Sequence, residues 1–158
     1  MLLNPIGRRL VAHAALILLV AMIAGIGLLM CVLGGLELWP GHIVPVTMPS
    51  TPAGWVRTHV GGMLNAILMM VIALLMPGLG FADVQARRIA NFLIGTGWAN
   101  TLFYWAAMWA PNRALTFGDN RIGPSNALSV IGLAPALLFA IISIVAIAMV
   151  ARQAWRRT

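Results

Sequence analysis

Four polar residues within the apolar segments of this sequence have side chains that could do chemistry: His59, Asn65, Asn100 and Tyr104. Polar groups are costly to place inside a lipid bilayer, so each one needs a partner or a function there. A neutral imidazole such as that of His59 can give a nitrogen lone pair to a metal ion, and it can equally form a structural hydrogen bond. The residue type by itself leaves both roles of His59 open.

Two glycines follow His59 closely along the chain. Gly61 and Gly62 remove side-chain bulk near the histidine, which suits either the edge of a flat macrocycle or the close approach of a neighbouring helix. Asn65 is six residues beyond His59, so it lies well around the helix from the histidine and faces a different part of any shared cavity.

Asn100 and Tyr104 are four residues apart in the segment GWANTLFYW. Residues with this spacing share one face of a helix, so both side chains can point into the same pocket. The structural alternatives are hydrogen bonding between helices for the asparagines and an interfacial position for the tyrosine.

The other two histidines differ in how they are placed relative to His59. His13 enters the first apolar segment from one side of the membrane and His59 enters the second from the other, so we expect roughly 20 Å between them. That distance is too large for the two to ligate one metal group, which disfavours a bis-histidine electron-transfer site. His42, in the intervening loop, is a conceivable second ligand and otherwise a solvent-facing residue.

The other reactive residue types exclude several kinds of enzyme. All three acids lie outside the apolar segments, so the membrane contains no carboxylate pair of the kind that many ion pumps use, and no hydrolytic triad shares one depth. Cys31 is the only cysteine, which excludes a disulfide framework and the CxxCH motif of covalent haem attachment and indicates a packing role. The acids are Glu37, Asp83 and Asp119.

Long apolar segments must position these side chains. Of the 158 residues, 61% are hydrophobic and only 8% are charged, which leaves too little polar surface for a soluble fold. The apolar runs are unbroken, so they predict helices and not the alternating strands of a β-barrel. We therefore predict an all-α, integral membrane four-helix bundle that forms a single domain over residues 1–158. The spans lie at about 10–33, 56–76, 88–109 and 127–150, each close to the roughly 20 residues that cross a bilayer.

The net charge of +7 comes from arginines at the ends of the predicted spans. The side of a membrane protein that is richer in arginine is normally cytoplasmic, which places the N-terminus, the C-terminus and the loop at 78–86 inside. The arginines form no patch on a soluble face, so we do not expect nucleic-acid binding. The cytoplasmic group is Arg8, Arg9, Arg87, Arg88, Arg152, Arg156 and Arg157, and the outer group is Arg57, Arg113 and Arg121.

Two outer segments, 34–55 and 110–126, are long and contain large apolar residues. A flexible connector is normally rich in serine and glycine and lacks such residues. We therefore expect both segments to pack over the outer end of the bundle. Four tryptophans at the predicted span ends are expected in an interfacial belt: Trp39, Trp55, Trp109 and Trp155.

Five segments together resemble the styrene oxide isomerases of bacterial styrene degradation. They are LGGLELWPGHI (33–43), PAGWVRTH (52–59), HVGGMLNA (59–66), GWANTLFYW (97–105) and APNRALTFGDNRIGP (110–124), and they cover nearly the whole chain. The last is the most specific, because hydrophobicity does not explain its PNR followed by TFG, asparagine and GP. The pocket-side residues around Thr96 and 101–109 depart from the family pattern, which leaves the preferred substituents of a substrate open.

The resemblance implies a multi-pass enzyme of a bacterial inner membrane, similar to a homotrimer, with a noncovalent ferric haem b near a subunit interface. In that family the residue matching His59 is the axial ligand of the iron, and we expect Gly61 and Gly62 to contact the haem. The substrate side is lined by the residues matching Asn65, Asn100 and Tyr104. The implied substrates are hydrophobic aryl epoxides such as styrene oxide, and the products are aryl acetaldehydes.

The implied chemistry is a Meinwald rearrangement, for which a ferric iron with one open position serves as a Lewis acid on the epoxide oxygen. Positive charge develops on the benzylic carbon, and a 1,2-hydride shift gives the aldehyde without oxidant or electron donor. Water must be excluded, because it would trap the cation as a diol. We expect Tyr104 and Asn100 to orient the epoxide and Asn65 to brace the site. The alternative functions are a membrane b-type cytochrome that anchors an electron-transfer partner and a small carrier without a cofactor.

Overall fold

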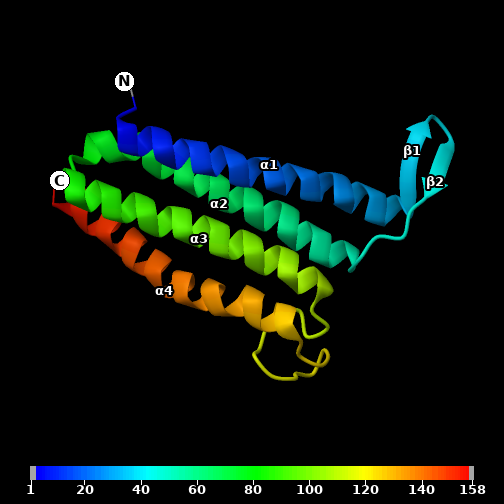
Figure 1. The fold of residues 1–158 in the computed structure, drawn as a ribbon. Coiled ribbons are helices and arrows are strands. Elements are labelled where there is room, and N and C mark those ends of the chain that lie inside the picture. The colour runs from blue at the N-terminus through cyan, green and yellow to red at the C-terminus, as the bar shows by residue number, and fades with distance from the viewer. Residues whose placement is uncertain (1–2, 157–158) are drawn as a thin grey trace.

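The computed structural model describes residues 3–156 and contains four long helices that lie side by side (Figure 1). They are α1 (Pro5–Leu33), α2 (Pro52–Leu79), α3 (Asp83–Trp109) and α4 (Ala127–Trp155). Consecutive helices run in opposite directions, so both termini and the α2–α3 turn lie at one end of the bundle. This arrangement confirms the predicted four-helix fold.

Local sequence signals set the ends of the first two membrane helices. α1 and α2 each begin with a polar N-cap, Asn4 or Thr51, whose side chain accepts a hydrogen bond from the first turn, followed by a proline that has no N–H to satisfy. Each ends at a glycine in the left-handed region, Gly34 with φ 71° and Gly80 with φ 60°. Because these signals lie outside the most apolar residues, both helices are longer than the predicted spans.

Three of the helices, α1, α2 and α4, are long and apolar enough to cross a membrane. In the most apolar 18-residue stretch of each of these helices, only 22–33% of the residues are buried within the protein. Large apolar side chains face outward instead, such as Ile141 and Ile144 of α4, which are 66% and 69% exposed. Lipid or other subunits cover a surface of this kind. The protein is therefore a multi-pass membrane protein.

α3 was also predicted to cross the bilayer, and its composition differs from that of the other helices. It is 27 residues long, but its sequence is more polar than those of the three helices that are apolar enough to cross a membrane. α3 contacts α1, α2 and α4 and buries more residues than any other helix. Small and hydroxyl residues such as Thr96, Gly97 and Thr101 pack against its neighbours at buried positions. The apolarity that identifies a lipid-facing helix is therefore weaker in a helix that other helices surround.

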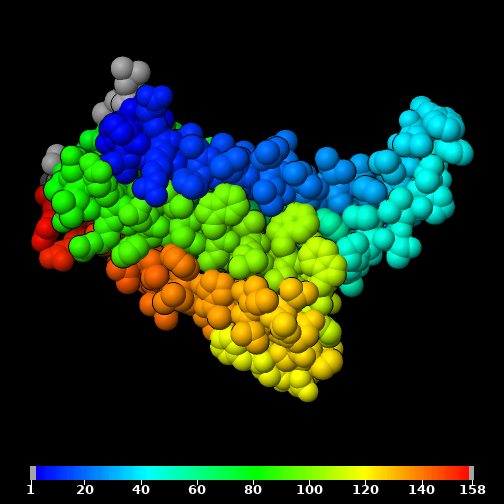
Figure 2. Space-filling model, viewed as in Figure 1, coloured from blue at the N-terminus to red at the C-terminus, as the bar shows by residue number. Residues whose placement is uncertain are grey.

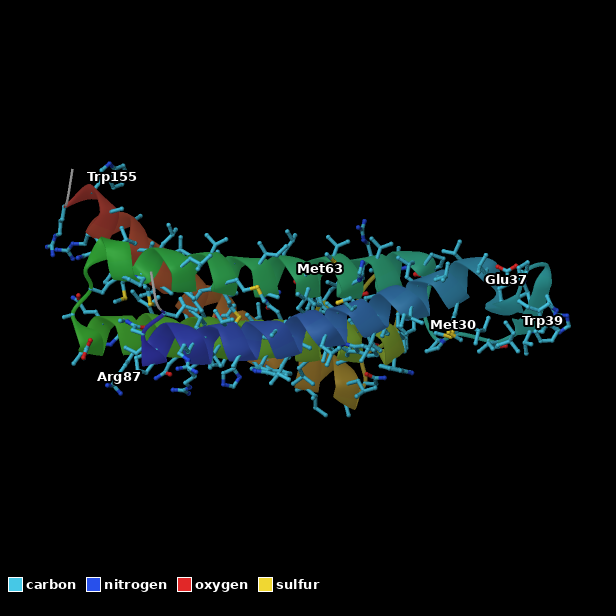
Figure 3. All side chains as sticks on the ribbon, turned by 90° about the horizontal axis from the view of Figure 1, so that it is seen from above. Met30, Glu37, Trp39, Met63, Arg87 and Trp155 are labelled. Atoms are coloured by element: carbon cyan, nitrogen blue, oxygen red, sulfur yellow. The ribbon has the colours of Figure 1, made fainter. Side chains whose placement is uncertain are left out.

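The charged residues separate the two ends of the bundle. Figure 3 shows Arg87 and Trp155 at one end, and Met30, Glu37 and Trp39 at the opposite end. The arginine-rich end also carries both termini, as the predicted topology requires. Arg157 lies outside the described residues. That this end faces the cytoplasm stays a prediction.

The outer segment after α1 contains an antiparallel hairpin that the all-α prediction missed. Its strands are β1 (Gly35–Trp39) and β2 (His42–Pro45), joined at Gly41 with φ 81°. Both strands are largely exposed, and Figure 2 shows the hairpin standing apart from the helices. The expectation that residues 34–55 pack over the bundle is therefore wrong for the hairpin, because its strands pair with each other and leave most side chains free of the helices.

The second outer segment behaves as expected. Residues 110–126 fold over the ends of α3 and α4, and Ala110, Asn112 and Ala114 within it are buried. This connection therefore forms an ordered cap on the outer end of the bundle.

Candidate active site

His59 lies two turns into α2, on the face that packs against α1. Its Nδ1 atom is 2.8 Å from the carbonyl oxygen of Ala21. A carbonyl oxygen can only accept, so in the neutral ring the proton is on Nδ1 and Nε2 keeps its lone pair. Nε2 has no hydrogen-bond partner among residues 3–156, and this atom is not fully buried. The protein therefore orients this imidazole and leaves one nitrogen accessible, as metal-ligating histidines require.

Gly25 of α1 provides the space for the imidazole. A Cβ added at Gly25 would lie 2.8 Å from Cε1 and 2.9 Å from Nδ1 of His59. The contact is between two helices, so the sequence alone does not pair Gly25 with His59.

If His59 binds a haem, as the family resemblance implies, replacing Gly25 with alanine will move the imidazole and reduce haem occupancy and aldehyde formation together, by at least about tenfold, as expected for a residue that supports a metal ligand. The measurement is haem content per protein beside the initial rate. Gly78→Ala is the matched control, because a Cβ at Gly78 meets nothing within 4 Å. Equal effects of the two substitutions would contradict the role of Gly25.

Gly61 and Gly62 do not lie open beside the imidazole within one chain. Gly62 faces α1, where an added Cβ would be 2.7 Å from the Cβ of Ala21. Gly61 faces α3, where an added Cβ would be 2.6 Å from Cζ of Tyr104. Both glycines therefore allow close packing, which is one of the two roles left open by the sequence. Their contact with a haem stays a prediction.

Tyr104, Asn65 and Asn100 come together between α2 and α3. Nδ2 of Asn100 donates to Oδ1 of Asn65 at 3.1 Å, and Nδ2 of Asn65 donates to the carbonyl oxygen of Gly61 at 2.8 Å. The ring of Tyr104 packs over Gly61, and its hydroxyl has no hydrogen-bond partner in the described part of the chain. The two amides thus hold each other in place, while the phenol is free to donate to a ligand.

Thr58, which sequence reasoning did not select, fixes α3 against α2 at this level. It is buried, and its hydroxyl lies 3.0 Å from the carbonyl oxygen of Gly54 and 3.4 Å from that of Tyr104. The backbone that carries the phenol is therefore tied to the helix that carries the histidine.

His59 and Tyr104 nevertheless lie on opposite sides of α2. His59 contacts α1, whereas Gly61, two residues later and so about 200° around the helix, contacts Tyr104. The space enclosed between α1, α2 and α3 is only about 160 Å³, below the roughly 300 Å³ at which small-molecule pockets begin. A single chain therefore cannot hold a tetrapyrrole between these two side chains.

The other histidines are engaged elsewhere. Nε1 of Trp98 donates to Nδ1 of His13 at 3.1 Å, and His42 stacks on Trp39 with 4.1 Å between ring centroids. At 1.5 Å per residue along α1, His13 lies about 12 Å from the level of His59, and α1 ends, before the hairpin, about 18 Å away in the opposite direction. The first distance is shorter than expected because His59 lies beside the middle of α1. Both distances are too large for axial ligation of one iron within a chain.

Trp55 belongs to the core and not to the interfacial belt that was expected for it. Its side chain is 4% exposed, and its Nε1 donates to the carbonyl oxygen of Pro49 at 2.8 Å. Its ring packs edge-on against Trp105 with centroids 5.9 Å apart. This cluster closes the outer end of α1, α2 and α3 against water. The other belt candidates are exposed as expected: Trp39, Trp109 and Trp155.

Asn112 is the centre of the outer cap. It is fully buried, and Nδ2 donates to the carbonyl oxygens of Thr116 at 2.9 Å and Gly118 at 3.0 Å. Its Oδ1 accepts from the N–H of Ala114 at 3.0 Å and from the hydroxyl of Ser129 at 2.6 Å. The PNR and TFG segments therefore meet in one hydrogen-bond network that joins the cap to α4.

Replacing Asn112 with alanine will lower the stability of the cap by about 2 kcal/mol or more, because several buried groups lose their partner. Thermal unfolding in detergent, followed by circular dichroism, checks this. Asn91→Ala, at an exposed position of α3, is the control. An unchanged midpoint for Asn112→Ala would show that the network does not stabilise the fold.

Helices that expose their apolar faces, an oriented imidazole and an apposed phenol and amide pair define an α-helical membrane protein with an intramembrane site. The family model for styrene oxide isomerase matches residues 6–155. The styrene-oxide isomerase of Pseudomonas fluorescens is 39% identical over 153 residues, which cover 97% of this chain and 90% of that protein. The chain belongs to the styrene oxide isomerase family.

Proposed function

We propose that this protein converts styrene oxide and related aryl epoxides to aryl acetaldehydes in a bacterial inner membrane, with a ferric haem b bound by His59. The observation that carries the proposal is the Nδ1–H bond to Ala21, which leaves Nε2 as a ligand. No group of three His, Cys, Asp or Glu side chains lies together within residues 3–156. A lone imidazole fits a metal whose remaining ligands come from a macrocycle, so these residues suit haem better than a protein-only metal site.

The side chains around Tyr104 provide the second half of the proposed site. When bound, ferric haem supplies a Lewis acid for the epoxide oxygen. Tyr104 donates its free hydroxyl to that oxygen as the benzylic C–O bond lengthens, and the Asn65–Asn100 pair holds the aryl epoxide in orientation. The aromatic cluster around Trp55 and the lipid-facing helices keep water from the benzylic carbon. Diol formation therefore does not compete with the 1,2-hydride shift.

We infer that the site is completed between subunits of a homotrimer, the assembly that the family resemblance implies. His59 and Tyr104 open on opposite faces of α2, so the histidine of one chain and the phenol of another can face the same haem. The surface next to His59 is apolar and available: Val60 is 44% exposed, and Met63 lies one turn further along this side of α2 (Figure 3). A two-fold or three-fold assembly buries such a surface by repeating one contact.

Mixed trimers test this arrangement of the site. Trimers of His59→Ala chains alone or of Tyr104→Phe chains alone are expected to have little or no activity. A trimer that contains both kinds of chain has one interface that carries both side chains, so about one third of the wild-type rate returns. The two chains carry different tags, and doubly purified assemblies are assayed. Mixed trimers no more active than either parent would contradict a site shared between chains.

The reaction itself is tested with styrene oxide deuterated at the terminal carbon. A 1,2-shift moves one deuterium to the benzylic carbon of the aldehyde, with no proton taken from water, which NMR spectroscopy detects. Solvent hydrogen in the product, or diol as the product, would contradict the proposed route. A cytochrome would instead show reducible six-coordinate low-spin haem and no turnover, and a carrier would be colourless.

A further inference from the structure

A cavity at the outer end of the bundle contains two arginines that face no acid. It has an empty volume of about 330 Å³ and lies between the start of α2, the end of α3 and the outer cap. Its lining residues are Ser50, Ala53, Gly54, Arg57, Ala107 and Arg113.

The fold holds the side chain of Arg57 and the backbone of Arg113, whose side chain is exposed. Nε of Arg57 is buried without a hydrogen-bond partner in residues 3–156, and its Cζ lies 5.5 Å from the ring centroid of Phe103. Arg113 has φ 56° in the turn that the buried Asn112 organises. The positive charges of Arg57 and Arg113 repel each other across the cavity.

The acids of the chain do not balance these charges. Glu37 accepts from the N–H of Gly41 in the hairpin, and Asp119 accepts from the N–H of Ser125 in the cap. Asp83 lies at the start of α3, at the opposite end of the bundle. Two like charges close together at the edge of a membrane are costly without a counter-ion, and the N-terminus of α2 adds further positive potential. Two guanidinium groups without an acid beside them therefore suit a ligand with two negative charges.

The position of the cavity indicates which ligand this is. Arg57 is four residues before Gly61, so it lies one turn nearer the outer end on the face of α2 that carries Tyr104. That face is the one to which we have assigned the haem ligated by an adjacent subunit. Haem b carries two carboxylates, on its propionate groups, which match the two guanidinium groups in number and charge.

We propose that Arg57 and Arg113 bind the two haem propionates and so orient the haem with its carboxylates toward the outer end of the bundle. This inference rests on the proposed function. Arginine forms paired, charge-assisted hydrogen bonds with carboxylates, which would satisfy the buried Nε and cancel the repulsion. It also gives both arginines a negatively charged partner, which no acid among residues 3–156 is seen to provide.

The test compares haem with haem dimethyl ester, whose propionates carry no charge. Full-length protein produced without haem is titrated with each compound in detergent, and the Soret absorbance gives the dissociation constants. The wild-type protein will prefer haem over the ester, and Arg57→Gln and Arg113→Gln will each weaken haem binding by about tenfold to a hundredfold while binding the ester as before. Arg57→Lys will restore part of the preference, since it keeps the charge.

Arg121→Gln, in the same outer cap but outside the cavity, is the control and will leave the preference unchanged. Circular dichroism and size-exclusion chromatography show that each variant is folded and assembled. If the Gln variants prefer haem over the ester as strongly as the wild type does, the proposal is overturned, while the Soret band of the wild type still supports the proposed function. That result would indicate that the cavity binds another anion, such as a lipid phosphate. A wild-type protein that binds neither compound overturns both proposals.

Discussion

Replacing His59 with alanine is expected to remove the haem and reduce aldehyde formation to the uncatalysed background. Among the histidines of the described helices, only His59 combines an oriented ring with a free nitrogen lone pair, because Nδ1 of His13 already accepts a hydrogen bond from Trp98. In the proposed function, its loss removes the protein ligand of the iron, and with it the electrophile. Losing a residue that only hydrogen-bonds to a metal ligand lowers affinity or activity about 10-fold to 100-fold, so loss of the ligand itself exceeds that range.

The measurement is the Soret absorbance per protein, recorded with the rate of phenylacetaldehyde formation. His42→Ala is the matched control, because His42 is exposed and stacks only on Trp39 in the hairpin. If His42→Ala lost the haem and His59→Ala kept it, the ligand assignment would be reversed.

Replacing Tyr104 with phenylalanine is expected to keep the haem and lower kcat by about 10²-fold to 10³-fold, the range found when one donor to a developing negative charge is removed. Only the hydroxyl is lost, because the ring still fills the space over Gly61. The hydroxyl has no other partner in the described part of the chain, so no structural hydrogen bond is lost with it.

Steady-state kinetics on the purified variant, with the Soret band as the measure of haem content, checks this second prediction. Thr101→Val is the control, because its hydroxyl already donates to the carbonyl oxygen of Gly97 at 2.8 Å within α3. A loss of haem in Tyr104→Phe would show a structural role, and an unchanged kcat would exclude the phenol from the reaction.

The helices could be predicted because apolar runs of membrane-crossing length have few alternatives to helix. α3 was predicted by the same argument, although its contacts with three neighbours make it more polar than a lipid-facing helix. The hairpin could not be found this way, since strands of five and four residues do not add to a hydropathy average. The alternation in LELW and the Pro40–Gly41 turn were the available signals.

Part of the site could also be predicted from the sequence. His59, Asn65, Asn100 and Tyr104 were selected because polar groups are rare in lipid, and the structure gives each of them a defined environment. Gly25 could not be predicted, because its contact depends on the rotation of α1 relative to α2.

The sequence accounts for only part of what the structure shows for two of the arginines. Arg57 and Arg113 were assigned to topology, which accounts for their side of the membrane but not for their shared cavity. Two residues 56 positions apart reach one cavity only through the packing of α2 against the end of α3 and the cap. The PNR motif was the signal for this cavity, since Asn112 shapes the turn that carries Arg113.

The most direct test of the ligand assignment is the absorption spectrum of His59→Gly with and without imidazole. The glycine variant leaves a space beside Gly25 that free imidazole can fill. We predict no Soret band in haem-supplied protein without imidazole, and the return of the band, together with aldehyde formation, when imidazole is added. A Soret band of wild-type shape and intensity in the variant without imidazole would contradict the assignment of His59 as the ligand, because another group would then hold the iron.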